Sequence, residues 1–155
     1  RFTKRIVKNI IEYRKSKTID TTTELAQLIK KSVPLTKEKI HPATRVFQAI
    51  RIEVNHELQN IKNTLNDVLH LLSVGAIISV ISFHSLEDRL VKQCFRYYSA
   101  KCRCKPTDPV CNCKPPMLEL INKKPITASQ SEIEINPPSR SAKLRVAKKI
   151  SSWEN

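Results

Sequence analysis

Glycine is nearly absent from this sequence. Among 155 residues there is one glycine, Gly75. Neither the GxGxxG fingerprint of dinucleotide-binding loops nor the GxxxxGK[ST] loop that cradles phosphates can be written with a single glycine. The sequence therefore excludes, within these residues, a nucleotide or cofactor site that is built on a glycine-rich loop.

Aromatic residues and long apolar runs are scarce as well. Aromatic residues make up 5% of the chain, and no apolar run approaches the roughly 18 residues of a membrane span. Residues 1–13 lack the apolar segment and the small-residue cleavage site of a secretory signal peptide. We therefore expect a cytoplasmic protein with no membrane partner, whose cysteines serve as thiols or metal ligands rather than as disulfides.

Charge of one sign dominates the composition. There are 28 Lys and Arg residues against 14 Asp and Glu, which gives a net charge of +14. The hydrophobic fraction of 40% can build a core in one domain or in parts of two. An excess of this size favours a polyanionic partner, and nucleic acid above all. The alternative interpretation is that the lysines only provide solubility.

Helical periodicity predicts the organisation of the first half of the chain. Residues 2–13 form a basic amphipathic pattern. Thr21 and Glu24 have the spacing of a capping box at the start of a second, short helix. From residue 41 to residue 72, apolar residues recur every three or four positions. This pattern predicts one long helix, with Gly75 as its C-terminal cap.

One polar stripe of that long helix is a candidate nucleic-acid contact. Arg45, Gln48, Arg51 and Asn55 lie next to the apolar stripe at helical spacing. Two guanidinium groups and two amides so arranged can grip phosphates or base edges. A solvated or salt-bridged helix face is the favoured alternative.

A short apolar run, IISVISF at residues 77–83, is followed at once by the polar sequence HSLEDR. The Ile- and Val-rich run predicts a strand that is buried on both faces, as in a parallel sheet. Ser85 and Asp88 have the spacing of a capping box that opens the next helix. Ligands of open α/β sheets bind beyond the carboxyl ends of strands, so the cluster from His84 to Arg89 is a candidate site. An ordinary strand–helix junction is the alternative.

The C-terminal part combines a helix, two strand candidates and a polar loop. Residues 117–121 and 144–150 have strand patterns, and the second presents Leu144, Val146 and Ile150 as its apolar residues. The segment between them is polar, with a helical turn expected near residues 129–133. Residues 136–139 read NPPS and lack the fourth-position aromatic of amino-group methyltransferase motifs. We interpret this segment as a basic loop in which Arg140 contacts phosphate.

Cys102, Cys104, Cys111 and Cys113 form a C-x-C-x6-C-x-C pattern. Four thiolates this close can bind zinc tetrahedrally. The usual structural sites have C-x2-C pairs, so we favour a thiol-rich surface loop, or a pair that oxidises, over a zinc site. Cys94 falls on the apolar side of its helix and is expected to be a small buried residue.

Three segments together resemble one family. They are HPATRVFQAIRIEVNHEL at residues 41–58, ISFHSLEDRLVK at residues 81–92 and SRSAKLRVAKK at residues 139–149. The sequence is similar to the ribosomal RNA small-subunit methyltransferase H family, also called MraW. The three segments occur in the order expected for that family and extend across most of residues 1–150.

The resemblance implies an α/β protein with part of a class I (Rossmann-like) fold for S-adenosylmethionine-dependent methyl transfer. Residues 1–40 would be the end of an inserted helical domain. Residues 41–155 would be the C-terminal half of the methyltransferase domain, with a cysteine-rich loop at residues 99–116. The strand at 77–83 would be central, and the strands near Leu118 and Leu144 would be the closing antiparallel pair. The cofactor-binding half of the family lies upstream of Arg1, so we expect a C-terminal fragment that neither binds S-adenosylmethionine nor methylates alone.

The resemblance also implies a substrate, the N4 amine of a P-site cytidine in 16S rRNA, and the small ribosomal subunit as partner. No catalytic residue is assigned. The residues expected to shape the target pocket are Ser82, His84, Ser85, Glu87 and Asp88. The residues expected to hold RNA are Arg45, Gln48, Arg51, Asn55, Arg89 and Arg140. A non-catalytic basic module that binds RNA or the ribosome is the alternative, and a zinc-centred interaction module is a third interpretation.

Overall fold

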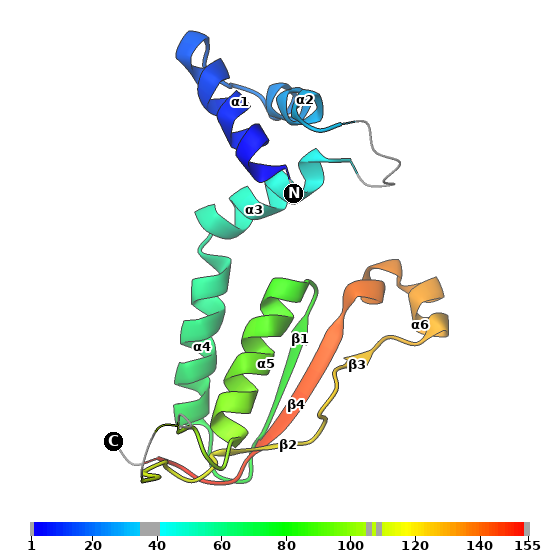
Figure 1. The fold of residues 1–155 in the computed structure, drawn as a ribbon. Helices are drawn as coiled ribbons and strands as arrows, with labels where there is room; N and C mark the ends of the chain where they lie inside the picture. Colours follow the sequence, from blue (N-terminus) through cyan, green and yellow to red (C-terminus); the bar gives the residue numbers. More distant parts are fainter. Residues whose placement is uncertain (1, 35–40, 105–106, 108–109, 154–155) are drawn as a thin grey trace. The chain divides into compact units, whose positions relative to one another are not determined.

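In a computed structural model, the chain is described at residues 2–34, 41–104, 107 and 110–153. It forms two compact units, Arg1–Glu57 and Leu58–Asn155 (Figure 1). The segments predicted at 1–40 and 99–116 lie partly outside the described residues, and the domain boundary predicted at residue 40 stays a prediction. Within the described ranges, no helix has both the length and the apolar character needed to cross a membrane.

The first unit consists of helices. They are α1 (Thr3–Ser16), α2 (Thr22–Ser32), α3 (Ala43–Val54) and the first residue of α4 (Glu57–Leu71). The predicted capping box is confirmed, because Thr21 Oγ1 accepts from the Glu24 N–H at 3.1 Å and Glu24 Oε2 accepts from the Thr21 N–H at 3.2 Å. Ser32 ties α1 to α2 by accepting from Asn9 Nδ2 at 2.8 Å and from the Arg5 guanidinium.

The prediction of one continuous helix from residue 41 to residue 72 is wrong. It is interrupted between Val54 and Glu57, where His56 has a φ of 52°. A left-handed residue cannot continue an α-helix. Arg51 and Asn55 donate to the carboxylate of Glu57 across this break. Periodicity of apolar residues continues through the break, so spacing alone could not reveal it.

Gly75 is not the cap of α4, because the helix ends at Leu71. Gly75 has a φ of 92°, and its N–H donates to the carbonyl of Lys149 at 2.7 Å. Glycine adopts this backbone conformation without the steric cost that a side chain brings. The residue therefore turns the chain from α4 into the sheet.

In the second unit, helices pack on one four-stranded sheet. After α4 its elements are β1 (Ile77–Ser82), α5 (Ser85–Ser99), β2 (Leu118–Leu120), β3 (Ile126–Thr127), α6 (Gln130–Ile135), the 3-10 helix η1 (Pro137–Ser141) and β4 (Lys143–Lys149). The strand order is β1–β4–β2, and β3 also pairs with β4. All three partners run antiparallel to β4. The three strands predicted from sequence are found as β1, β2 and β4, whereas β3 was not predicted. β1 and β2 run parallel to each other on either side of β4.

β1 departs from its predicted burial. Among the described residues its strand partner is β4, in an antiparallel register from Ile77↔Lys148 to Ser82↔Lys143. Ile78 is buried on one face, whereas Ile77 and Ile81 on the other face are each 60% exposed. The prediction of a parallel strand buried on both faces is therefore wrong for the part of the chain described.

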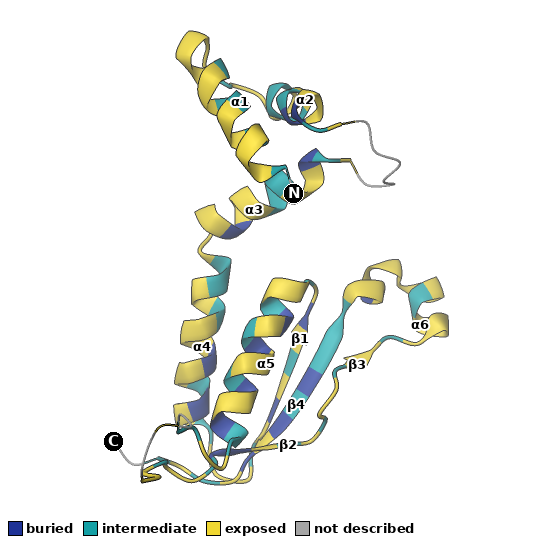
Figure 2. Cartoon of the chain, in the orientation of Figure 1, coloured by how far each residue is buried: buried dark blue, intermediate teal, exposed yellow. Residues whose placement is uncertain are grey.

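The core of the second unit lies between α4, α5 and the sheet (Figure 1). Its buried residues are Leu65, Leu69, Ile78, Val91, Phe95, Tyr98, Met117, Leu118 and Ala147. Figure 2 shows buried residues in dark blue along β4. The face of β4 that is buried carries Arg145, Ala147 and Lys149. It is opposite to the face that carries Leu144, Val146 and Ile150, the apolar residues of the sequence pattern.

Lys149 explains part of this reversal. It is 1% exposed, and its Nζ donates to the carbonyls of Leu69 at 2.8 Å and Leu72 at 2.6 Å. The last carbonyls of a helix have no partners within the helix and carry its partial negative charge. The buried ammonium therefore stabilises the C-terminal end of α4. Because lysine is polar, a pattern of apolar residues does not predict that Lys149 is buried.

Candidate functional site

The carboxyl end of β1 and the start of α5 form a tightly bonded turn. His84, rather than the predicted Ser85, is the N-cap of α5, and its Nδ1 accepts from the Glu87 N–H at 3.4 Å. Glu87 Oε2 accepts in return from the N–H groups of Phe83 at 2.8 Å and His84 at 3.2 Å. The capping box is thus shifted by one residue from the prediction, because an imidazole nitrogen can accept where a hydroxyl was expected. Glu87 shapes this turn through its carboxylate.

Two buried polar atoms at this end of the sheet have no hydrogen-bond partner among the described residues. They are Nε2 of His84 and Oγ of Ser139. His84 Nε2 lies 3.1 Å from Glu87 Oε1 without forming a hydrogen bond. Ser139 belongs to η1, which leads directly into Lys143, the strand partner of Ser82. Because His84 Nδ1 accepts from a backbone N–H, Nε2 is the ring nitrogen that can donate. Buried polar atoms without partners are rare, so at this end of the sheet Nε2 can donate to a ligand and the Ser139 hydroxyl can donate or accept.

The remaining residues predicted for the target pocket have different surroundings. Ser82 is 3% exposed, and its Oγ donates to the carbonyl of Lys143 at 3.5 Å. Ser85 is exposed in the first turn of α5. Phe83 is 56% exposed at the same turn, and sequence analysis did not select it. The sequence does mark this residue, since Phe83 is the aromatic that ends the apolar run IISVISF immediately before HSLEDR.

Asp88 holds α5 against β4. Arg145 donates to it through Nε at 2.8 Å and through Nη2 at 3.2 Å, and Lys143 Nζ lies 3.6 Å away. Both members of the bidentate pair are buried, at 8% exposed for Asp88 and 7% for Arg145. The hydrogen bond from Arg145 is the main cause that lowers the pKa of Asp88. The carboxylate is therefore engaged by two cations from β4.

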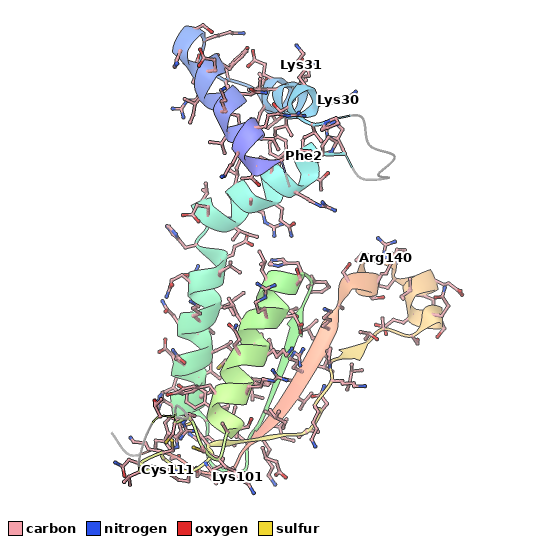
Figure 3. All side chains as sticks on the ribbon, in the orientation of Figure 1. Phe2, Lys30, Lys31, Lys101, Cys111 and Arg140 are labelled. Atoms are coloured by element: carbon pink, nitrogen blue, oxygen red, sulfur yellow. The ribbon has the colours of Figure 1, made fainter. Side chains whose placement is uncertain are left out.

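Two predicted RNA contacts lie in the second unit. Arg89 is exposed on α5, and Arg140 is exposed on η1. Figure 3 labels Arg140 at the end of the unit where β4 begins. Exposed guanidinium groups beside the carboxyl end of β1 can contact phosphate oxygens.

The four residues of the predicted polar stripe lie in the first unit and have different surroundings there. Arg51 forms a bidentate pair with Glu57, at 2.8 Å from Nε and 3.2 Å from Nη2, and Asn55 donates to the same carboxylate at 3.4 Å. Arg45 instead lines an apolar groove of about 710 Å³ between α1 and α3. Gln48 is half-buried. The phosphate-binding role of these four residues stays a prediction.

The four cysteines of the predicted metal motif come together after α5. Their sulfur atoms all lie within 4.8 Å of one another. Cys94 lies apart from them in α5 and packs against the core, and burial raises the pKa of its thiol to about 11. The prediction that Cys94 faces the core is confirmed, although the residue is half-buried rather than buried.

The sequence matches the MraW methylase family over residues 1–150. It is 55% identical over 151 residues to the ribosomal RNA small subunit methyltransferase H of Caldicellulosiruptor bescii, covering 97% of this chain and 49% of that protein. It is 50% identical over 150 residues to the protein of the same name from Clostridioides difficile, covering 95% of this chain and 48% of the relative. The protein of that name from Geobacter sp. (strain M21) is 48% identical over 153 residues, with 97% and 49% covered.

The chain spans about half the length of these relatives. The family match covers both compact units, including the β1–α5 turn and the strand β4. The chain therefore belongs to the MraW methylase family.

Proposed function

We propose that this chain forms the RNA-binding and target-base part of a 16S rRNA cytosine-N4 methyltransferase that uses S-adenosylmethionine. The observation that carries the proposal is the polar cluster at the carboxyl end of β1, where His84 Nε2 and Ser139 Oγ are buried without partners among the described residues. A ligand with hydrogen-bonding edges would satisfy them. The names of the relatives, ribosomal RNA small subunit methyltransferase H, favour rRNA as that ligand.

The topology supports a partial class I fold. β4 runs antiparallel between β1 and β2, which fits the closing antiparallel pair expected from the family resemblance. The apolar residues Ile77 and Ile81 on the exposed face of β1 fit a sheet that continues and is covered in a complete enzyme. In that arrangement the carboxyl end of β1 lies where open α/β sheets bind their ligands.

The chemistry of amine methylation suits residues that position rather than ionise. The N4 amine of cytosine is neutral, so its lone pair must be aligned with the methyl group. His84 and Ser139 would hydrogen-bond the edge of the base. Phe83, which is 56% exposed, offers a ring face to a base taken out of its stack. Arg89 and Arg140 would hold the neighbouring phosphates.

S-adenosylmethionine supplies the methyl group when bound, but the described residues do not fit a site for it. The chain has one glycine, and Gly75 lies in the turn between α4 and β1, where its N–H donates to the carbonyl of Lys149. The target-pocket cluster, which we define as Ser82, His84, Glu87 and Ser139, comes from β1, the turn after it, α5 and η1. We therefore propose that this chain alone neither binds S-adenosylmethionine nor methylates RNA.

The experiment compares this chain with a chimera. In the chimera the chain follows the part of the Caldicellulosiruptor bescii relative that precedes the matched region. The chimera is expected to bind S-adenosylmethionine by isothermal titration and to form N4-methylcytidine in small ribosomal subunits, while the chain alone does neither. Methylation by the chain alone would contradict the proposal, as would a chimera that binds the cofactor but leaves the rRNA cytidine unmodified.

A non-catalytic RNA-binding module is the second candidate. The net charge of +14 favours it as strongly as the enzyme. The same chimera discriminates between the two, because a binding module would bind RNA equally well with or without the added half and would add no methyl group.

A further inference from the structure

We infer that Cys102, Cys104, Cys111 and Cys113, the cysteine quartet, form a structural site for one zinc ion that fixes the loop after α5. This site lies outside the target-pocket cluster and does not rest on the proposed methyltransferase function. The quartet comes from the second compact unit alone, and Figure 3 labels Cys111 in it.

The distances between the sulfur atoms fit a tetrahedral ion. A Zn–S distance of about 2.3 Å places the sulfurs of a regular tetrahedron about 3.8 Å apart. Cys104 Sγ and Cys113 Sγ are 3.4 Å apart, and Cys102 Sγ and Cys111 Sγ are 3.7 Å apart. All four lie within 4.8 Å of one another. A small contraction or expansion of the quartet would therefore complete the coordination.

The same distances argue against two disulfides. A disulfide requires an S–S distance of about 2.05 Å, and all four cysteines are free. Each sulfur lies within 4.8 Å of the other three, so all four surround one centre. Convergence of four sulfurs on one centre is the arrangement that a tetrahedral ion needs, and four thiolate ligands favour zinc or an iron–sulfur centre over harder cations.

Backbone N–H groups already point at the sulfurs. The N–H of Arg103 donates to Cys113 Sγ at 3.0 Å, and the N–H of Cys104 donates to Cys102 Sγ at 3.4 Å. Hydrogen bonds to the ligand atoms orient them and stabilise the thiolate form that a metal binds. The C-x-C spacing allows both bonds: Arg103, between two ligands, donates to a cysteine of the other pair, and the second cysteine of the pair, Cys104, donates to the first, Cys102.

Arg103 connects the quartet to the rest of the unit. It donates through Nη1 to the carbonyls of Ala100 at 2.8 Å and Tyr97 at 3.2 Å, near the C-terminal end of α5, and through Nη2 to the carbonyl of Lys114. Its guanidinium lies 4.8 Å from the ring centre of Trp153. An ion held by Cys102 and Cys104 would therefore fix Arg103, and with it the C-terminal end of α5 and the last residues of the chain described.

The position of the quartet indicates a structural role. It follows the C-terminal end of α5, whereas His84 caps the N-terminal end. A helix of 15 residues is about 22 Å long, so the quartet lies a helix length from the target-pocket cluster. Four protein ligands also leave no open coordination position for a substrate or a water.

Neighbouring cations suit the charge of such a site. Zinc with four thiolates carries a net charge of about −2. Lys101, Arg103 and Lys114 lie beside the quartet in sequence. Figure 3 labels Lys101 and Cys111 in this part of the second unit. Positive side chains on both arms of the loop would offset the negative charge of the filled site.

The test measures metal content and a tryptophan signal. The 155-residue chain, purified reduced and without chelators, is expected to contain one zinc per chain by mass spectrometry of the elements. Cobalt(II) in its place should give the visible absorption of a tetrahedral thiolate complex. Trp153 is the single tryptophan, so its fluorescence should change when a chelator removes zinc and return when zinc is added.

Matched variants separate the quartet from other thiols. Cys104→Ser and Cys113→Ser are expected to lose the zinc and the tryptophan response, whereas Cys94→Ala, outside the quartet, should keep both. Wild-type protein that takes up no zinc after full reduction would overturn the inference, and so would bound iron in place of zinc. Zinc retained by both serine variants would overturn it as well. If the serine variants fail to fold, the zinc content and cobalt spectrum of the wild-type chain still decide.

Discussion

Breaking the buried pair of Asp88 and Arg145 should strongly destabilise the second unit. The two side chains are 8% and 7% exposed and share two hydrogen bonds, at 2.8 Å and 3.2 Å. Asp88→Ala leaves the guanidinium of Arg145 buried without its partner. Removing one member of a buried ion pair typically costs 3–5 kcal/mol, so we expect a loss of about 4 kcal/mol in the free energy of unfolding.

Removal of the other member should cost less. In Arg145→Met, Asp88 still has Lys143 Nζ at 3.6 Å, so its charge keeps one cation. The loss in the free energy of unfolding should then be about 2 kcal/mol, which is typical of a hydrogen bond to a charged group. The double variant Asp88→Ala/Arg145→Met should lose less than the sum of the single variants, because it leaves no buried charge alone.

Urea unfolding followed by Trp153 fluorescence measures these losses. Trp153 packs against the core of the second unit, so its signal reports the unit that contains the pair. Lys148→Met is the control, since Lys148 is exposed on the same strand and should change stability by no more than about 0.5 kcal/mol. A loss for Asp88→Ala within that range would refute the reasoning.

The same pair has a pH signature with a definite sign. The pKa of Asp88 is lowered in the folded chain, chiefly by the hydrogen bond from Arg145. Its stabilisation is therefore fully present above the unfolded pKa of about 3.9 and is lost as the pH falls through the lower folded value. The stability gap between wild type and Asp88→Asn should stay constant at neutral pH and narrow in acid. A gap that narrows as pH rises would contradict this account.

Three further predictions concern other parts of the second unit. Lys149→Met removes the hydrogen bonds to the carbonyls of Leu69 and Leu72 and should lower the free energy of unfolding by about 2 kcal/mol in the same urea assay; an unchanged midpoint would exclude a stabilising role. Gly75→Ala should cost about 1–3 kcal/mol through backbone strain alone, because φ is 92° while no atom lies within 4 Å of an added Cβ; a neutral effect would show that the turn relaxes. Arg140→Glu in the chimera should weaken binding of a 16S rRNA fragment and reduce the salt slope by about one; an unchanged slope in fluorescence anisotropy would argue against a phosphate contact.

Local signals predicted most elements of this fold. Apolar spacing located α1, α2 and α5, and the capping box of Thr21 and Glu24 has the predicted partners. These features depend on contacts within a few residues. The strands β2 and β4 were located as well, because each is a short segment with a strand pattern that is separated from its neighbours by proline and polar residues.

Features that depend on tertiary partners were not predictable. Arg145 and Lys149 are polar, so a pattern of apolar residues does not predict their burial, whereas Asp88 and the carbonyls of α4 bind them in the core. The break at His56 follows from backbone conformation rather than from spacing. In the candidate site, the sequence identified His84 and Glu87 but not the way they cap α5. Which of their atoms lack a hydrogen-bond partner depends on the folded structure, so it could not be predicted.

The central claim is that the carboxyl end of β1 forms the target-base pocket. Its most direct test is the rate at which the chimera forms N4-methylcytidine in small ribosomal subunits. His84→Asn keeps a good capping residue but removes Nε2, and Ser139→Ala removes the other unpartnered atom; Ser141→Ala, exposed on η1, is the control. We predict that the first two variants lower the rate about 10- to 100-fold, with unchanged affinity for S-adenosylmethionine, and that the control does not. Rates equal to wild type in both pocket variants would contradict the account.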